Sequence, residues 1–489
     1  MGTRDTVTAL ALACMLTACA VGPDYVRPQV EEPAAWPALS STQRQAQSAA
    51  STVTPQSFDG RQWWSVFHDP VLDALIADAA RQNLDLQIAA SRIAQARAQR
   101  EAVASGRWPS ASLNAGGLRS RFSENGLMSG GGQQSGDAQQ QSDTGPSNTF
   151  QYGFDALWEL DLWGKTRRSI EAADADTEAA VEARHDAMVS LTAEIARAYF
   201  ALRGAQAQRR ITLENLRTQG DILDLSRSRQ QAGFTSEADV LQAQSRVAES
   251  EAALPQLEQS VEQGYNQLAL LLSLPPGALR ARLEHEAALP ALPPQVPVGL
   301  PGELLRRRPD IRRSEAQLHG ATAQVGVAVS QLFPSVRLGA VGGMQASHVS
   351  DLNDWASRFF LLGSFISMPV FEGGQLKANI RISKARNGEA LLQYRHTVLA
   401  AYHDVDNAII AYMREQQRMA ALQQQVDYAR RALALAQSQY REGLIAYLDV
   451  LEAERNLHQA QLQLAQSAVV TRTDLVALFK ALGGGWSAG

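Results

Sequence analysis

Histidine and carboxylate side chains are the first candidates for chemistry in this chain of 489 residues. His403 and Asp406, in the sequence His-Asp-Val-Asp, would share one face of a helix and could bind a metal ion together. No third ligand accompanies them, and none of the eight histidines belongs to a His-Glu-x-x-His motif or pairs with a serine elbow. The sequence therefore predicts neither a metal site nor an enzyme.

Cys19 is the second candidate, as a site of covalent modification. The only cysteines are Cys14 and Cys19, so no disulfide or cysteine metal site is expected further along the chain. The apolar run Val7–Leu16 is too short to span a bilayer and is typical of a signal peptide. It ends in Leu-Thr-Ala-Cys, which resembles the lipobox of bacterial lipoproteins and implies a lipid on Cys19. An ordinary secretory signal with a chance cysteine is the alternative.

Composition and charge exclude several partners. The net charge of −5 and the 19% of charged residues provide no basic surface for nucleic acid or for anionic lipid. Aromatic residues make up only 6%, and Ala, Gln, Leu, Arg and Glu dominate long stretches, as in long helices packed on one another. No cofactor is expected beyond the lipid on Cys19.

The chain contains an internal duplication. The sequence WPSASL at Trp108–Leu113 recurs as FPSVRL at Phe333–Leu338, and AGFTSEADVLQA at Ala232–Ala243 recurs as EGLIAYLDVLEA at Glu442–Ala453. The first pair is 225 residues apart and the second 210, a difference that the low-complexity insert Gly126–Ser147 explains. Two copies of one unit are therefore predicted.

The duplication divides the chain into six predicted segments. These are a signal peptide (1–18), a lipidated tether and equatorial segment (19–65), a first repeat (66–275), a Pro-rich linker (276–302), a second repeat (303–480) and a tail (481–489).

Helices are expected in each unit. In the first unit, apolar residues recur at helical spacing over Pro70–Ala104. A second helix is expected over Lys165–Arg229, with a possible break near Gly204, and a third helix over Glu237–Leu272 runs back along it. At 1.5 Å per residue, the second of these helices would reach about 100 Å, which favours coiled-coil-like packing over a globular domain. A purely structural coiled coil would explain the helices alone.

The expected strands exclude that interpretation. Over Phe150–Leu162, even positions are apolar or aromatic and odd positions include Asp155, Glu159 and Asp161. Such alternation is typical of a membrane strand with lipid on one side and water on the other. Weaker alternation predicts partner strands around residues 107–122, 333–345 and 359–371.

Four strands cannot close a barrel, and open strand edges are not tolerated in hydrocarbon. Two copies would give eight strands with a filled interior, whereas three copies give twelve strands and room for an open lumen. We therefore expect a homotrimer.

The ordered set of motifs resembles the TolC-like outer-membrane efflux proteins, in particular the lipoprotein channel subunits of tripartite efflux pumps. The motifs are VGPDYVRP, WWSVFHDPVLDALI, WELDLWGK, RRRPDIRRSEAQL, FPSVRL, PVFEGGQ and YREGLIAYLDVLEAER. The resemblance implies a mainly α fold with long helical hairpins and four membrane strands per chain, forming a 12-stranded β-barrel and a periplasmic α-helical barrel.

The same resemblance implies a passive exit duct in the outer membrane of a Gram-negative bacterium, for drugs or other small molecules. Its expected partners are a periplasmic adaptor and an inner-membrane RND pump. An outer-membrane component of type I protein or metabolite secretion is the alternative, followed by a lipidated periplasmic adaptor. The duplication and the four amphipathic strands argue against the adaptor.

The family resemblance also implies a gate that closes like an iris at two hairpin tips, around Gly233 and Gly443. The residues matching the gate are Asp449 and Glu452 at the narrowest point, Arg455 as their partner, Leu448 as an apolar constriction, and Tyr440 with Asp239 as an inter-helix bond. Three copies of each carboxylate on a threefold axis would repel one another unless paired. Helix capping is the alternative role for Asp239 and Asp449, because each follows soon after a turn glycine.

Two further motifs receive structural interpretations. Pro309 and Asp310, within RRRPDIRR, suit the start of a helix, and the neighbouring arginines are expected as surface contacts. Trp63 and Trp64 are expected to pack in the equatorial belt.

Overall fold

The computed structural model describes residues 20–42, 51–121 and 146–486, in two compact units. Unit 1 comprises Met1–Val26, Gln95–Thr177 and Gln317–Leu391, and unit 2 comprises Arg27–Ala94, Glu178–Ala316 and Leu392–Gly489. The predicted lipid site at Cys19 and most of the predicted insert lie outside the described residues.

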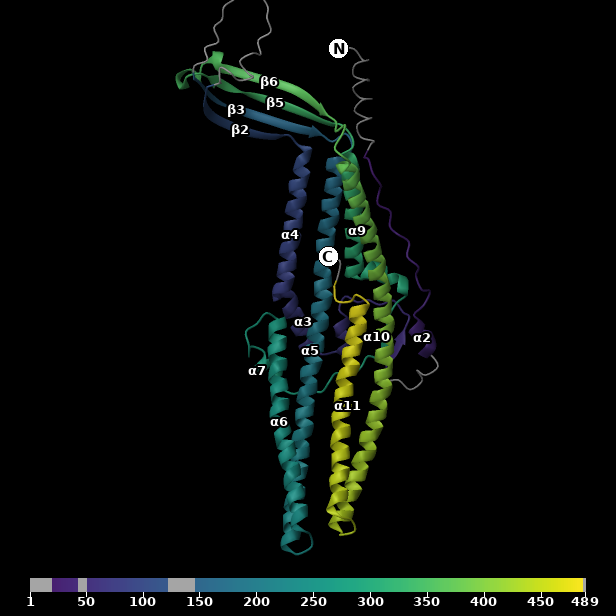
Figure 1. Cartoon of the computed structure of the whole chain (residues 1–489). Helices are drawn as coiled ribbons and strands as arrows, with labels where there is room; N and C mark the ends of the chain where they lie inside the picture. Colours follow the sequence, from purple (N-terminus) through teal and green to yellow (C-terminus); the bar gives the residue numbers. More distant parts are fainter. Residues whose placement is uncertain (1–19, 43–50, 122–145, 487–489) are drawn as a thin grey trace, which may run out of the picture. The chain divides into compact units, whose positions relative to one another are not determined.

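Long helices occur in the same order in the two halves of the chain (Figure 1). They are α4 (Leu84–Ala104), α5 (Lys165–Gln231) and α6 (Glu237–Leu271), then α9 (Pro309–Ser330), α10 (Gln375–Arg441) and α11 (Tyr447–Ala481). α5 and α10 have 67 residues each, and α6 and α11 have 35 each, the equality that a duplicated unit would have. Across the described ranges, no helix is both long and apolar enough to cross a membrane.

Gly204 does not break α5, contrary to the expectation from the sequence. A methyl group at this position would overlap Cγ2 of Val469 on α11, and one at Gly264 of α6 would lie 3.0 Å from Cδ1 of Leu202. Glycine therefore lets neighbouring helices approach closely, although it lowers helix propensity by about 1 kcal/mol relative to alanine. These glycines are packing residues.

The stretch expected as one helix over Pro70–Ala104 is two helices, α3 (Pro70–Gln82) and α4, separated by Asn83. Asn83 ends α3 with an extended backbone, and its Oδ1 accepts a hydrogen bond from the amide of Leu86 at 3.0 Å. Its Nδ2 donates to the carbonyl of Leu271 at 2.8 Å. One side chain therefore starts α4 and ties it to the end of α6.

Short elements surround the helices of unit 2. They are α2 (Pro37–Thr42), β1 (Thr52–Thr54), the 3-10 helix η2 (Trp63–Phe67), α7 (Arg280–Leu283), β4 (Gln295–Pro297), η5 (Pro301–Glu303) and α8 (Leu304–Arg307). β1 pairs in parallel with β4, which joins the segment before the first repeat to the linker between the repeats. Trp63 is buried and stacks on Phe479 of α11, with 5.2 Å between ring centroids.

Unit 1 contains an antiparallel sheet in the order β2-β3-β5-β6. The strands are β2 (Ser110–Ser120), β3 (Ser147–Leu160), β5 (Ser335–Ala346) and β6 (Arg358–Ser367). In the part of the chain that the structure describes, β2 and β6 each have a single neighbour, so the sheet has two open edges.

The register places apolar side chains on one face of this sheet. Leu113 lies opposite Phe154, which lies opposite Gly342, and Gly342 lies opposite Phe360. Leu113, Phe154 and Phe360 are all exposed, as is Ile366 further along β6. Because opposite residues of an antiparallel pair share a face, these side chains form a continuous apolar surface with nothing from the described part of this chain covering it.

The other face carries the polar groups. Asp155 accepts hydrogen bonds from Ser112 at 2.9 Å and from Asn114. Glu159 pairs with Arg337 of β5 at 3.3 Å. The third expected carboxylate of this strand, Asp161, lies beyond the end of β3. It accepts hydrogen bonds from backbone amides of the first turn of α5 and is a helix cap.

β6 departs from this division of faces. In β6, Phe360 and Ile366 lie on the apolar face of the sheet, and Phe359, Leu361 and Phe365 lie on the opposite face. The strand is therefore apolar on both sides. The weaker alternation noted in the sequence over residues 359–371 has this cause.

We expect Gly343→Ala to destabilise the sheet by about 1–3 kcal/mol, as overpacking does. Gly343 lies directly opposite Gly153, and a Cβ on Gly343 would collide with the backbone of Tyr152. A Cβ on the neighbouring Gly342 would make only ordinary contacts at 3.7 and 3.8 Å, so Gly342→Ala is the matched control. Thermal unfolding followed by circular dichroism measures both, and equal melting temperatures would contradict this account.

Candidate functional site

The two long hairpins of unit 2 turn in the same way. Gly233 and Gly443 follow α5 and α10 with φ of +80° and +78°, a conformation that glycine adopts without strain. The amide of Gly233 donates to the carbonyl of Gln230, and the amide of Phe234 donates to the carbonyl of Arg229. The second turn repeats these two bonds, which together close a helix end in a Schellman motif. Both glycines therefore lie at the tips between antiparallel helices.

The two tips pack against each other at one end of unit 2 (Figure 1). Residues of α5, α6, α10 and α11 form one buried cluster at the tips. It comprises Ile222, Leu223, Val240, Ala243, Leu433, Tyr440, Tyr447, Val450 and Leu451. Arg229 of α5 adds a polar link, because its Nη1 donates to the carbonyl of Tyr440 at 2.7 Å and its guanidinium lies 4.6 Å from the ring centroid. Sequence analysis missed Arg229, since only the fold shows which hairpin it reaches.

Asp239 acts as a helix cap in this structure. Its Oδ2 accepts hydrogen bonds from the amide and hydroxyl of Ser236 at 3.1 and 2.9 Å, and Thr235 donates to the same oxygen. These bonds, the Thr235 hydroxyl first, lower the pKa of the carboxyl. Within the chain Asp239 does not bind Tyr440, whose hydroxyl is buried without a partner among the described residues. The inter-helix bond between Asp239 and Tyr440 stays a prediction.

Asp449 combines a cap with an exposed carboxylate. Its Oδ2 accepts from the amide of Ala446 at 3.1 Å, at the start of α11. One turn later Glu452 lies 3.8 Å from Arg455, and both side chains are exposed, so this ion pair contributes little to stability. Leu448 is also exposed, with 63% of its surface accessible. These four residues therefore present charged and apolar groups to the outside of the tip.

The two hairpin tips differ in charge. With the spacing of 210 residues, Asp449 corresponds to Asp239, but Glu452 and Arg455 correspond to the neutral Gln242 and Ser245. Both copies therefore keep the capping acid, and only the second copy carries charges at the other two positions. The comparison of the two copies separates the helix cap, which both need, from groups specific to the second hairpin.

Glu454 is a second residue that sequence analysis missed. It is 4% exposed on α11, and its Oε1 is buried without a hydrogen-bond partner in the described part of the chain. Burial raises the pKa of its carboxyl to about 7, although the charge of Arg246 opposes the shift. One turn further, Nε2 of His458 is also buried without a partner among the residues described, and burial lowers the pKa of that ring. Burial at the tip thus favours the neutral forms of two titratable groups.

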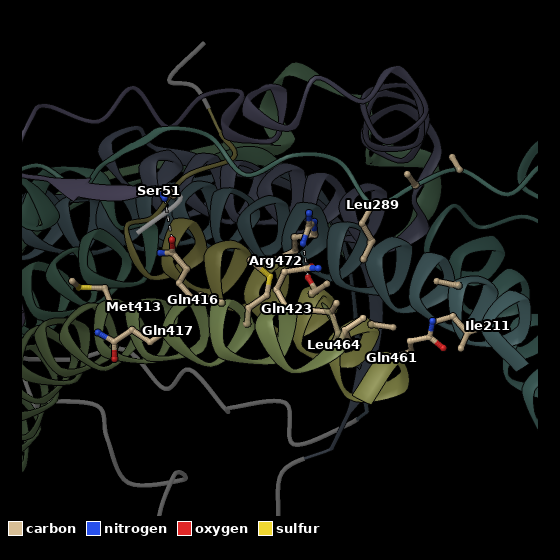
Figure 2. Close-up of a pocket in the computed structure, with 18 of the residues that line it drawn as sticks. Ser51, Ile211, Leu289, Met413, Gln416, Gln417, Gln423, Gln461, Leu464 and Arg472 are labelled. Carbon is tan, nitrogen blue, oxygen red and sulfur yellow. Dashed lines mark hydrogen bonds between the residues drawn. The ribbon is translucent and has the colours of Figure 1, made fainter. Parts of the chain in front are cut away.

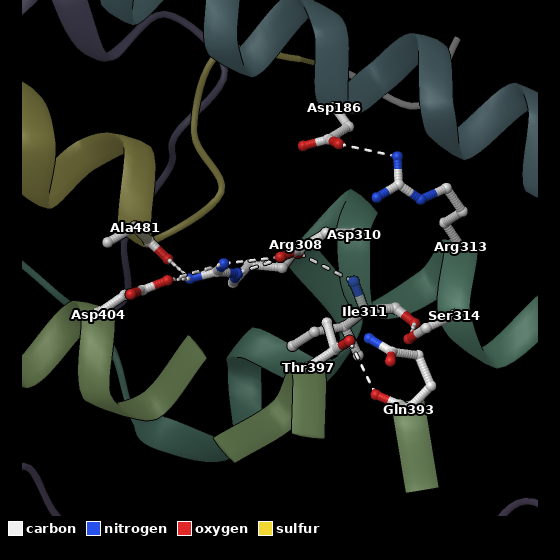
Figure 3. Close-up of polar contacts among 10 residues, drawn as sticks. All are labelled: Asp186, Arg308, Asp310, Ile311, Arg313, Ser314, Gln393, Thr397, Asp404 and Ala481. Carbon is white, nitrogen blue, oxygen red and sulfur yellow. Dashed lines mark hydrogen bonds and ion pairs between the residues drawn. The ribbon is translucent and has the colours of Figure 1, made fainter. Parts of the chain in front are cut away.

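The arginines of the RRRPDIRR motif connect helices, and the expectation of surface contacts is wrong for Arg308. Figure 3 shows Arg308 between Asp310 at the start of α9, Asp404 of α10 and the carbonyl of Ala481 at the end of α11. Arg313 pairs with Asp186 of α5 at 3.0 Å. Pro309 does begin α9. The motif is therefore a clamp that holds four helices of unit 2 at one level.

His403 and Asp406 lie on α10. Asp406 accepts a hydrogen bond from the amide of Ala38 at 2.9 Å, which fixes α2 to α10. No cluster of three or more potential metal ligands occurs among residues 20–42, 51–121 and 146–486.

Comparison with known proteins yields consistent matches. The outer membrane efflux protein family matches residues 75–273 and 300–484. The pyoverdine export outer membrane protein OpmQ of Pseudomonas putida is 33% identical over 479 residues, which cover 98% of this chain and 97% of that protein. The toluene efflux pump outer membrane protein TtgC of Pseudomonas putida is 32% identical over 488 residues, covering 99% and 96%.

Solved structures show the same fold. The outer-membrane channel OprN superposes with a TM-score of 0.85 at 36% identity, covering 96% of this chain and 100% of that one. The open state of the MtrE outer membrane channel of Neisseria gonorrhoeae gives 0.77 at 29% identity, covering 96% and 98%.

We expect the hairpin tips to loosen as pH rises. Because the pKa of Glu454 is raised from 4.5 to about 7 in the folded chain, its stabilisation is complete below about pH 4.5 and is lost as pH passes through 7. Between about pH 5.5 and 8 the hydrogen-exchange protection of residues 447–460, corrected for intrinsic rates, should fall about tenfold.

Glu454→Gln should remove most of this pH dependence, because the amide stays neutral. Glu251→Gln, which changes an exposed acid of α6 away from the tip, is the control and should keep the wild-type pH dependence of exchange. A profile in the Glu454→Gln variant that matches wild type would show that another group titrates.

Proposed function

Since the chain belongs to the outer membrane efflux protein family, we propose that three copies of it form the exit duct of an efflux pump, closed at the hairpin tips. It is an outer-membrane efflux channel and not an enzyme. The proposal concerns its assembly, partners, cargo and gate. One observation carries it: the sheet of unit 1 has an exposed apolar face, a polar face and, within the described residues, two open edges.

The open edges support the trimer. β2 and β6 leave backbone amides and carbonyls unpaired in the described part of the chain, and each such group costs several kcal/mol in hydrocarbon. Joining β6 of one copy to β2 of the next satisfies both edges, and three copies give the twelve strands needed for an open lumen. The polar face with Asp155, Glu159 and Arg337 would line water, and the apolar face would meet lipid.

The proposed partners are a periplasmic adaptor and an inner-membrane RND pump, and the proposed cargo is drugs or other small molecules. Relatives named for pyoverdine export and toluene efflux support small-molecule transport. A role in type I protein or metabolite secretion is the second candidate, although no feature of the described residues favours it.

The charges at the second hairpin tip are the proposed gate. In a trimer, three copies of Asp449 and Glu452 would face a common axis, and Arg455 would partly neutralise them. An adaptor that displaces the contacts of Arg229 or Arg455 would then open the tips.

Two double variants separate a charge gate from a helix cap. Asp449→Asn with Glu452→Gln removes the charges but keeps an acceptor for the amide of Ala446, whereas Asp449→Ala with Glu452→Ala removes both. If charge holds the gate, both double variants should raise the open probability in planar bilayers several-fold.

The control is Glu251→Gln with Glu258→Gln, two exposed acids of α6 away from the tip, which should conduct like wild type. If only the double alanine variant raises the open probability, then the helix cap at Asp449, and not the charge, keeps the gate closed. Unchanged conductance in both double variants would remove Asp449 and Glu452 from the gate.

The lipid on Cys19 is proposed as a secondary anchor. With a barrel in the membrane, we expect Cys19→Ser to change maturation and yield but to leave SDS-resistant trimers that conduct. Intact-mass measurement should detect acyl chains on wild type and none on the variant. Loss of trimers while export continues would show that the lipid has a larger role.

A further inference from the structure

Unit 2 contains a cavity of about 730 Å³ that the function proposed above does not use (Figure 2). α5, α10 and α11 form its walls together with residues near β1 and in the linker between the repeats. The lining is mostly apolar, with side chains such as Ile211, Leu289, Met419, Val426 and Leu464. This volume and this mixture of many apolar groups with a few polar ones are typical of small-molecule sites.

The charged groups that line the cavity are all cationic. Arg210, Arg430 and Arg472 contribute to the wall, and no described aspartate or glutamate does. Arg210 has an acid nearby, since its Nη1 lies 3.6 Å from Glu286. The wall therefore has an excess of positive charge.

Arg472 is the most buried of these cations, with 8% of its surface exposed. Its Nε donates to the carbonyl of Pro290 at 2.8 Å and its Nη1 to the carbonyl of Ala468 at 2.7 Å. Among the described residues it forms no ion pair with a carboxylate, and burial lowers the pKa of the guanidinium to about 10. Residues 43–50, which precede Ser51 of the cavity wall, contain no acid in the sequence. A buried cation without a counter-ion is costly, and an anion from solution would offset that cost.

A further hydrogen-bond donor is left unused in the cavity wall. Oε1 of Gln416 accepts from the amide of Ser51 at 3.1 Å, while Nε2 of Gln416 is buried without a partner in the described part of the chain. Burial raises the pKa of the neighbouring Tyr412 to about 12, and both a hydrogen bond with the Ser51 side chain and the charge of Arg472 oppose that shift, so the Ser51 and Tyr412 hydroxyls serve each other. The side-chain nitrogen of Gln416 can only donate, so the group that it lacks is a hydrogen-bond acceptor.

We infer that this cavity binds a small amphipathic anion, with a carboxylate, sulfonate or phosphate head on Arg472 and an apolar body against the helices. The site lies in the wall of unit 2 and is separate from the residues of the hairpin tips. Occupation would connect α10 and α11 to the linker through Pro290.

The test uses 8,8,8-trifluorooctanoate, observed by fluorine NMR with the full-length protein in lipid nanodiscs and with empty nanodiscs subtracted. 8,8,8-Trifluorooctan-1-amine and the corresponding alcohol have the same apolar body with a different head. We expect saturable binding of the carboxylate at one site per chain, and at least tenfold weaker binding of the amine and of the alcohol.

Arg472→Gln should weaken carboxylate binding at least tenfold, and Ala465→Phe should abolish it by filling the cavity, of which Ala465 is part of the wall. Arg203→Gln is the matched control. Arg203 is also buried and donates to linker carbonyls, those of Leu283 and His285, but it does not line the cavity. It should leave carboxylate binding unchanged.

Equal binding of carboxylate and amine, no saturable carboxylate binding, or binding that persists in a folded Ala465→Phe variant would each overturn the inference. The measurement on the Ala465→Phe variant keeps the inference testable even if the Arg472→Gln variant does not fold. Equal loss of binding in Arg203→Gln and Arg472→Gln would also overturn it, because both arginines would then act only as clamps on the linker.

Discussion

The hydrogen-bonding demand of the backbone in hydrocarbon governs this molecule more than any side-chain contact. Each chain supplies four strands whose order leaves β2 and β6, in the described residues, with one open side each. Water could satisfy those edges, but lipid cannot, so a sheet with an apolar outer face is incomplete as a monomer. Backbone groups also need partners at the ends of the long helices of unit 2, where Gly233 and Gly443 close one pair of helices and Asp239 and Asp449 cap the start of the next pair.

Long helices must then be held in register, because small rotations accumulate along 67 residues. Two devices achieve this in unit 2. Glycines such as Gly204 bring helix surfaces into direct contact, and Arg308 connects α9, α10 and the end of α11 with charged hydrogen bonds. Asp310 and Asp404 both lie against this largely buried cation and offset the cost of its burial. The clamp therefore specifies position more than it adds stability.

Patterns repeated along the sequence were predictable, and contacts between distant segments were not. Alternation over residues 150–160 and helical spacing in the repeats identified the strands and helices, because both are local. Gly204 was misread because a glycine that packs against a neighbouring helix has the same sequence signal as one that ends a helix. Asp161 was misread because a helix cap can continue the alternation of the preceding strand. Arg308, Arg229 and Glu454 depend on which helices meet, which no single segment encodes.

Duplication clarifies where function diverged from scaffold. Groups that both copies retain, such as the turn glycines and the capping acids, serve the hairpin itself. Glu452, Glu454 and Arg455 occur only in the second copy, where the first has Gln242, Gln244 and Ser245. Glutamine and serine keep these positions polar without charge repulsion and without the cost of burying a charge. The three ionisable residues that replace them within one turn of the second copy therefore need a reason other than helix stability. For Glu452 and Arg455, the proposed threefold axis would supply one, because charges there would interact with their own copies in the other two chains. Glu454 differs from these two residues, since it is buried within the chain and burial favours its neutral form.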